Sequence, residues 1–279
     1  MSGHGRAGEA PALEVLLDFD GTLVEPNVAI ELITEFAPDG RRISEEVDLA
    51  LHAGEMTLRQ AWEREAALLP PDRIEEMIAW VRTRVPLRAG ARSWLAQLDR
   101  YGVPVTVVSG GLDFYIAPVL AREGLALPVL SDSARIGPDG RLEVTHPHGH
   151  ASCRLCGICK AQAVLRTVRP GARSVFLGDG STDRYAAEVT DIVFARRRLI
   201  DICRRAGIPY YPFESFAPVE AQFERWLSGA EPMPEPRIRG LPGSKCPISA
   251  AGGRLEGAPT APDGNGAPTH PAPAARGPG

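Results

Sequence analysis

A short apolar run, Val15-Leu16-Leu17, is followed at once by the motif Asp18-Phe19-Asp20-Gly21-Thr22-Leu23. An apolar run bounded by turn residues is typical of a buried strand. Because side chains alternate along a strand, we expect Asp18 and Asp20 on one face, beyond the strand's carboxyl end. One carboxylate of such a pair can attack an electrophile while it holds a hard divalent cation, and the other can carry a proton. A lone Asp-x-Asp would favour an ordinary acidic turn, but the longer motif is more specific.

The composition narrows the class of protein. The chain has 279 residues, of which 44% are apolar, which is enough for one large domain or two small ones. Its formal net charge of −4 gives no electrostatic reason to expect binding to nucleic acid or to an anionic membrane. The basic clusters Arg196-Arg197-Arg198 and Arg204-Arg205 are expected to be solvated helix faces. The sequence shows no membrane-spanning run and no signal-peptide core, so we expect a cytoplasmic protein.

Both ends of the chain differ in composition from its middle. Residues 1–11 are small and polar, and residues 229–279 are dominated by Gly, Pro, Ala and Ser. Such segments bury too little apolar surface to offset the entropy lost on ordering. We therefore expect a flexible N-terminus over 1–11, a disordered tail over 229–279, and a folded part over 12–228.

Strand and helix signals alternate within the folded part, which predicts an α/β fold with a doubly wound, Rossmann-like parallel sheet. Residues from about 28 to 85 carry only helical spacing, which is too long for one crossover helix. We expect a catalytic core of residues 12–26 and 87–228 and an inserted helical cap of residues 27–86. The predicted strands are 15–17, 103–108, 129–130, 174–177, 192–195 and 208–212, with a hairpin turn at Pro138-Asp139-Gly140.

Three further motifs lie where predicted strands end or helices begin. They are Ser109-Gly110-Gly111, Lys160, and Gly178-Asp179-Gly180 with Asp183. Alone, the Ser-Gly-Gly motif could be an ordinary turn, Lys160 could be a solvated helix residue, and the Gly-Asp-Gly motif could be a hairpin. Ligands of doubly wound sheets bind beyond the carboxyl ends of the strands, so these motifs are expected to form one site with the aspartate pair.

In this order, the four motifs resemble the haloacid dehalogenase superfamily of aspartate-nucleophile phosphatases, over about residues 13–220. The position of the helical block resembles the subclass with a helical cap, which includes the phosphoserine phosphatases. The resemblance implies that Asp18 attacks phosphorus to form an aspartyl-phosphate, and that Asp20 is the general acid and base. It implies that Lys160 neutralises charge, and that the Ser109 hydroxyl and the Gly110 N–H bind phosphoryl oxygens.

The resemblance also implies a Mg²⁺ site. Its ligands would be Asp18, the backbone carbonyl of Asp20, and Asp179, while Asp183 would act from the second layer or through water. We add Gly21 and Asn27 to the residues expected to bind phosphate or substrate.

A closer resemblance is to the phosphatases of methionine salvage, which act on an enol phosphate. The segments that carry this resemblance are Phe36-Ala37-Pro38, 108–114, His146-Pro147, 156–160, 193–196, 207–210 and 212–214. It implies a partner that is a small phosphorylated metabolite. The exact substrate and the oligomeric state stay open.

Three other functions remain open. Phosphoserine phosphatases carry a glutamate nine residues after the nucleophile, whereas Asn27 stands there in this chain and Glu25 lies close by. A phosphotransferase would use the same residues to pass the phosphoryl group to another metabolite. A non-catalytic module that binds metal through its Cys and His residues would have no need of both aspartates and the lysine.

A thiol loop precedes Lys160. It has the spacing Cys153-x-x-Cys156-x-x-Cys159 and follows His146, His148 and His150. Thiolates and imidazoles at such spacing can form a tetrahedral Zn²⁺ site. The alternatives are reduced packing thiols in a loop that orients Lys160, or a labile disulfide. Of the other cysteines, Cys203 is expected in the core and Cys246 in the tail without a role.

Overall fold

The computed structural model of the chain describes residues 12–237 and 239–253. The predicted flexible N-terminus, 1–11, and the part of the predicted tail over 254–279 lie outside the described residues. None of the described helices has the length and hydropathy needed to cross a membrane.

A seven-stranded, mostly parallel sheet forms the centre of the described chain, in the order β4-β3-β2-β1-β5-β6-β7. Strand β1 (Leu13–Leu17) pairs in parallel with β2 (Val105–Leu112) and β5 (Arg173–Gly178), so the predicted first strand is central. All five of its residues are buried, as expected for a parallel strand covered on both faces. The other strands are β3 (Val129–Ile136), β4 (Leu142–Thr145), β6 (Ile192–Ala195) and β7 (Tyr211–Pro212). This topology confirms the predicted doubly wound α/β fold.

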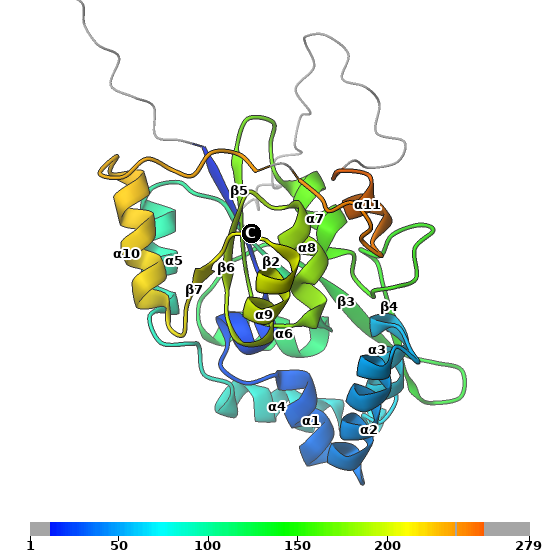
Figure 1. Cartoon of the computed structure of the whole chain (residues 1–279). Helices are drawn as coiled ribbons and strands as arrows, with labels where there is room; N and C mark the ends of the chain where they lie inside the picture. Colours follow the sequence, from blue (N-terminus) through cyan, green and yellow to red (C-terminus); the bar gives the residue numbers. More distant parts are fainter. Residues whose placement is uncertain (1–11, 238, 254–279) are drawn as a thin grey trace, which may run out of the picture.

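Helices cover both faces of the sheet (Figure 1). Leu13, Val15 and Leu17 belong to the apolar cluster on one face, whereas Leu16 belongs to the cluster on the other. The first face is covered by α5 (Ala91–Arg100), α6 (Asp113–Arg122) and α10 (Phe216–Leu227), and the second by α7 (Lys160–Thr167), α8 (Arg184–Val189) and α9 (Arg197–Ala206). The alternation of side chains along β1 therefore divides the core into two layers.

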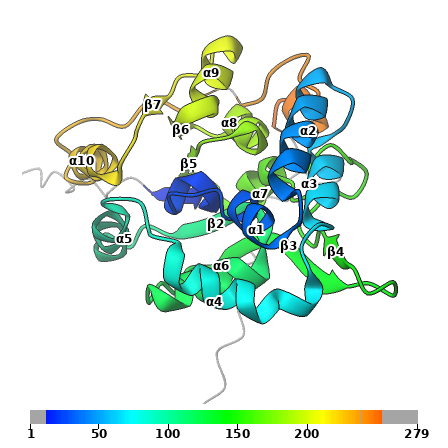
Figure 2. The same cartoon turned by 90° about the horizontal axis from the view of Figure 1, so that it is seen from below.

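Four α-helices lie within residues 28–84, where the helical block was predicted. They are α1 (Val28–Phe36), α2 (Gly40–Ala53), α3 (Leu58–Ala66) and, after the short η2 (Pro71–Arg73), α4 (Ile74–Arg84). Figure 2, which views the molecule from below, shows them across the end at which β1 terminates. A capping box between Thr57 and Gln60 begins α3.

The chain enters and leaves this helical block at adjacent points. Val24 and Leu87 form an isolated antiparallel bridge. The Glu25 N–H donates to the Pro86 carbonyl at 3.2 Å, and the Arg88 N–H donates to the Leu23 carbonyl at 2.9 Å.

The start of the predicted tail has more structure than its composition indicated. The short helix α11 (Pro247–Ala250) follows Cys246, and the side chains of Cys246 and Ile248 are buried. Polar contacts secure this segment: the Gly240 N–H donates to the Glu188 carbonyl at 2.7 Å, and Arg239 pairs with Asp191 at 2.8 Å. Hydrogen bonds and an ion pair thus order residues that apolar content alone did not predict to fold. Cys246 was expected to lie in the tail without a role, but its side chain is buried.

Candidate active site

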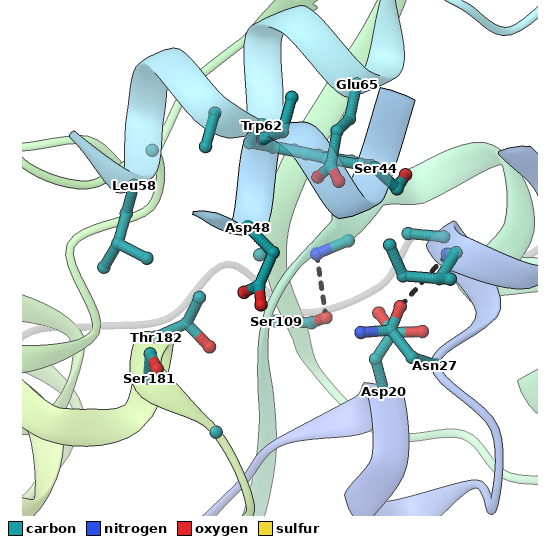
Figure 3. A pocket seen from close by; sticks show the side chains of 18 of the residues that line it. Asp20, Asn27, Ser44, Asp48, Leu58, Trp62, Glu65, Ser109, Ser181 and Thr182 are labelled. Carbon is teal, nitrogen blue, oxygen red and sulfur yellow. Dashed lines mark hydrogen bonds between the residues drawn. The ribbon is translucent and has the colours of Figure 1, made fainter. Parts of the chain in front are cut away.

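A cavity of about 610 Å³ lies between the carboxyl ends of the strands and helices α1, α2 and α3. Figure 3 shows side chains of the core and of the helical block facing it from opposite sides. The cavity brings together most of the predicted site residues, namely Asp18, Asp20, Asn27, Ser109, Gly110, Lys160 and Asp179. The predicted convergence at strand ends is therefore seen in the structure.

Lys160 links the first and last acidic motifs. Its Nζ donates to Asp18 Oδ1 at 2.6 Å and to Asp183 Oδ1 at 2.7 Å, and all three side chains are buried. Burial raises the pKa of Asp18, the charge of Asp183 raises it further, and Lys160 opposes both. Burial lowers the pKa of Lys160, but the two carboxylates outweigh this effect and hold the pKa above its usual range. The lysine therefore carries its positive charge into the floor of the cavity.

Asp20 is held by two hydrogen bonds. Tyr115 Oη donates to its Oδ2 at 2.9 Å, and the Val28 N–H donates to its Oδ1 at 2.8 Å. Burial raises the pKa of Asp20 to about 6, although both bonds oppose that shift. A carboxyl group with a pKa near the working pH can both donate and accept a proton.

Strand alternation is not what places Asp18 and Asp20 in the same cavity. Strand β1 ends at Leu17, and Asp20 lies in the tight turn η1 (Phe19–Leu23). Gly21 permits this turn because its φ is 72°. A Cβ atom at Gly21 would lie 2.3 Å from Asp179 Oδ2, so a side chain there would also displace the carboxylate of Asp179.

Three carboxylates form a candidate metal centre. Oxygen atoms of Asp18, Asp179 and Asp183 lie within 4.8 Å of one another. Burial and the charge of Asp183 raise the pKa of Asp179 to about 6. The oxygens of Asp183 are engaged by Lys160 and by the N–H groups of Asp179 and Gly180, the latter two at 2.9 Å each. Hard divalent cations prefer such oxygen ligands, and a cation would relieve the repulsion among the three carboxylates, so the residues fit Mg²⁺.

The Ser109-Gly110-Gly111 motif lies within β2, where the pairing with β3 shifts register. Ser109 is fully buried, and its Oγ accepts a hydrogen bond from the Gly111 N–H at 3.0 Å. A Cβ atom at Gly111 would lie 2.1 Å from Tyr115 Oη and 2.6 Å from Asp20 Oδ2. The motif is therefore packed directly against Tyr115 and Asp20.

The prediction that Arg196-Arg197-Arg198 is a solvated face is wrong for Arg196, which is buried. Its Nη1 donates to the Gly21 carbonyl and lies 4.0 Å from Asp179 Oδ2. Arg197 has a φ of 44° and approaches Asp179 to 3.8 Å. Because β6 ends at Ala195, this basic cluster reaches the same edge of the sheet as the acidic motifs, and that position was the overlooked signal.

Arg88 is a second arginine that the sequence did not reveal. It is buried, and burial lowers its pKa. It donates from Nη2 to the Gly21 carbonyl at 2.8 Å and from Nε to the Thr22 carbonyl at 2.9 Å. Arg88 thus fixes the turn that carries Asp20 by satisfying its backbone carbonyls.

The helical block supplies polar and aromatic groups to the cavity (Figure 3). Asn27 caps α1, because its Oδ1 accepts the Ile30 N–H at 3.2 Å. Trp62 and Glu65 reach the cavity from α3, and Ser44 and Asp48 reach it from α2. Burial raises the pKa of Glu65 to about 7, and the nearby Asp48 adds to this shift.

The thiol loop leads directly into Lys160, the first residue of α7. All five cysteines lie in the described part of the chain and are free thiols, and Cys203 is buried in the core as predicted. His146, which precedes the thiol loop, pairs with two carboxylates. Its Nδ1 lies 2.9 Å from Asp132 Oδ1, and its Nε2 lies 3.1 Å from Glu63 Oε1.

Comparisons with known proteins agree with this geometry. Residues 15–188 match the family described as haloacid dehalogenase-like hydrolase. A 2-hydroxy-3-keto-5-methylthiopentenyl-1-phosphate phosphatase of Exiguobacterium sibiricum is 32% identical over 73% of this chain and 93% of its own length. The protein of the same name from Geobacillus kaustophilus is 31% identical over 76% and 96%.

Solved structures show the same fold. A substrate-bound phosphoserine phosphatase superposes with a TM-score of 0.58 at 18% identity, over 77% of this chain and 99% of its own. The family match covers more than half of the sequence, and the strand order, the paired aspartates and the buried lysine agree with it. The chain therefore belongs to the haloacid dehalogenase-like hydrolases.

Proposed function

We propose that this chain is a Mg²⁺-dependent phosphatase that hydrolyses 2-hydroxy-3-keto-5-methylthiopentenyl-1-phosphate through an aspartyl-phosphate. The observation that carries the proposal is the buried contact of 2.6 Å between Lys160 Nζ and Asp18 Oδ1, on the floor of a cavity that Asp20 also lines. Two relatives that share about a third of their residues with this chain bear the name of this activity.

The residues support a reaction in two steps. Asp18 attacks phosphorus, the bond from phosphorus to the leaving oxygen breaks, and Asp20 gives that oxygen a proton. Asp20 then takes a proton from water as the water attacks phosphorus, which releases inorganic phosphate and restores Asp18. Lys160 offsets negative charge in both steps, and Ser109 and the Gly110 N–H bind phosphoryl oxygens.

Mg²⁺ would be held by Asp18, Asp179 and the backbone carbonyl of Asp20, with Asp183 orienting Asp179 and Lys160. When bound, the ion would neutralise charge on the phosphoryl group. Arg196 and Arg197 would hold Asp179 in place for this role, since both lie within about 4 Å of it.

We propose residues 27–86 as the cap that selects the substrate. Asn27 offers no charge where a phosphoserine phosphatase places a glutamate. Burial raises the pKa of Glu65 to about 7, so near neutral pH much of this side chain is protonated and can donate a hydrogen bond to a ketone oxygen. Both features favour a substrate whose head group carries no ammonium over phosphoserine.

A phosphotransferase would need an acceptor metabolite that excludes water from the site. Asp20 could take a proton from either water or such an acceptor. We prefer hydrolysis because the relatives carry the name of a phosphatase. We also propose a cytoplasmic location with a small phosphorylated metabolite as the substrate, a setting in which the free thiols would stay reduced.

We further propose a Zn²⁺ ion at the thiol loop, held by Cys153, Cys156 and Cys159, with a structural role. Three thiolates are three of the four ligands that a closed tetrahedral zinc site requires. Because Lys160 follows Cys159 directly, an ordered loop would fix the start of α7 and with it the lysine of the active site.

The test is a comparison of kcat/KM for the methylthio-enol phosphate and for phosphoserine, with Mg²⁺ and full-length protein. We expect the enol phosphate to be the better substrate by at least about tenfold, which corresponds to about 1.4 kcal/mol. A preference for phosphoserine would refute the assignment and indicate Glu25 as the ammonium partner. Activity on neither compound, with hydrolysis of another phosphate ester, would keep the reaction and reject the substrate.

A further inference from the structure

Four of the five cysteines line one small cavity. The lining includes Cys153, Cys156 and Cys159 of the thiol loop and Cys246 of the C-terminal segment, which lies 87 residues beyond Cys159 in the sequence. The cavity has a volume of about 10 Å³, which is near the least that can hold one water-sized particle. Cys203, the remaining cysteine, is buried elsewhere.

We propose that Cys246 is the fourth ligand of a structural zinc site with Cys153, Cys156 and Cys159, and that this site secures residues 239–253 to the core. The proposal rests on the zinc ion proposed for the thiol loop and is independent of the substrate. Four sulfur ligands are a common donor set of closed, structural zinc sites.

Backbone N–H groups act on two of these sulfur atoms. The backbone N–H groups of Gln162 and Ala161 lower the pKa of Cys159, and those of Ser249 and Ile248 lower the pKa of Cys246, although burial outweighs them. N–H donors stabilise a thiolate, which is the form that binds a metal. Cys246 is thus supported in the same way as a cysteine of the thiol loop.

Burial favours the neutral form of three of these thiols. It raises the pKa of Cys156 and Cys246 and brings that of Cys159 to about 11. Metal binding would therefore release protons, and its affinity would fall at low pH.

His150 also lines the cavity, but its ring is engaged in hydrogen bonds. His150 Nδ1 accepts the N–H groups of Cys153 at 3.1 Å and Ser152 at 3.3 Å. A nitrogen that accepts these bonds carries no proton, so a neutral ring carries its proton on Nε2. Neither ring nitrogen then has a free lone pair for a metal, and this arrangement favours the sulfur of Cys246 as the fourth ligand.

The thiols would have to turn further into the cavity to bind. Among the described residues, the trio of Asp18, Asp179 and Asp183 is the one group of metal-ligating side chains whose atoms already lie within 4.8 Å of one another. Cysteine has a single side-chain torsion before its sulfur, so rotation about that bond is the movement that carries each sulfur toward a bound ion.

The test measures zinc in full-length protein purified from cells supplied with zinc and then washed with excess Mg²⁺ to clear the aspartate site. We expect one zinc per chain, as in other closed sites, and a loss of most of it in C246S. The matched control is C203S, which removes a buried thiol outside the cavity and should keep its zinc. Wild-type protein without zinc, or C246S with as much zinc as wild type, would overturn the proposal.

Two further measurements separate ligand loss from misfolding. Cobalt added to metal-free wild-type protein should give the near-ultraviolet absorption of a site with four thiolates, and its absence would overturn the proposal without any variant. Protease cleavage within residues 239–253 should speed up when zinc is removed from wild type, and an unchanged rate would contradict the anchoring role. Zinc binding with no phosphatase activity would refute the proposed enzyme function alone, because neither measurement depends on turnover.

Discussion

The Tyr115 hydroxyl donates a hydrogen bond of 2.9 Å to Oδ2 of Asp20, across 95 residues of sequence. The same hydroxyl would lie 2.1 Å from a side chain at Gly111, so the glycine motif and the tyrosine fit together around one carboxyl group. Tyr115 is fully buried, and the centroid of its ring lies 6.4 Å from that of Phe19. It is thus placed to set both the orientation and the acidity of the proposed acid and base.

Replacing Tyr115 by phenylalanine should lower kcat by about tenfold to a hundredfold, since a hydrogen bond to a charged group contributes about 1.5–3 kcal/mol. The bond lowers the pKa of Asp20, which is about 6 with the bond present, so its loss should raise that pKa. Because water activation needs ionised Asp20, the acidic decline of kcat should move to higher pH. The measurement is a pH profile of kcat, with Y101F, at an exposed tyrosine, as the control. An unshifted decline would contradict the role of Tyr115.

Replacing Asp18 by asparagine should abolish turnover without unfolding the protein, because volume is preserved while the nucleophile and its charge are lost. D20N should instead slow both the formation and the hydrolysis of the aspartyl-phosphate, since each needs a proton transfer. Rapid-quench measurement of the phosphoenzyme separates the two steps. Appreciable activity in D18N, with deamidation excluded by mass spectrometry, would reject the covalent mechanism.

Removal of divalent cations should stop activity, because the candidate metal centre consists of oxygen ligands from carboxylates and a carbonyl. We expect Mg²⁺ to restore the rate and Ca²⁺ to restore it poorly, since Ca²⁺ is larger and its coordination looser. Activity is measured after dialysis against chelator and again after each cation is added. An enzyme that keeps its full rate in excess chelator does not use this metal centre. D179N should need more Mg²⁺ for half-maximal activity.

Glu65 should make the protein less stable as the pH rises. Burial places its pKa at about 7 in the folded protein, above the ordinary value of 4.5. The favourable contribution of the protonated form is complete below pH 4.5 and is lost as the pH rises through 7. E65Q stays neutral, so at pH 8.5 it should exceed wild type in free energy of unfolding by about 1–3 kcal/mol, a range reduced for the partial exposure of Glu65.

Urea unfolding at pH 4.5 and pH 8.5 tests this expectation. At the lower pH, E65Q and wild type should have similar stability. The control is E55Q, on the exposed turn after α2, which should match wild type at both values. Equal stability of E65Q and wild type at pH 8.5 would show that Glu65 is ionised there without cost.

The parts of the site that follow strands in the sequence were predictable, and the parts that depend on distant contacts were not. Asp18, Ser109 and Asp179 could be placed because each follows or ends an apolar run whose carboxyl end must reach a common edge of the sheet. Tyr115 and Arg88 gave no such signal, since a tyrosine in a helix or an arginine near a loop is ordinary until the fold brings it to the turn of Asp20.

Two errors have the same physical origin. Arg196 reads as a surface residue in a basic run, but its side chain is buried where it meets the carbonyl of Gly21 and the carboxylates of Asp179 and Glu214. Residues 239–253 read as tail because they contain few apolar side chains, yet their backbone and arginine contacts order them. The composition of a segment indicates how much apolar surface it can bury. It does not indicate which polar groups the fold brings within hydrogen-bonding distance of it.

The bridge between Val24 and Leu87 has a consequence for how this enzyme could change over evolution. Residues paired in an antiparallel bridge have Cα atoms about 5 Å apart, a gap that a tight turn of a few residues can close. The chain could therefore exchange the whole helical block for another insertion, or lose it, while the strands and the aspartates keep their places. Residues 27–86, which we propose select the head group, and the residues proposed to act on phosphorus thus belong to separable stretches of the sequence that meet at this one bridge.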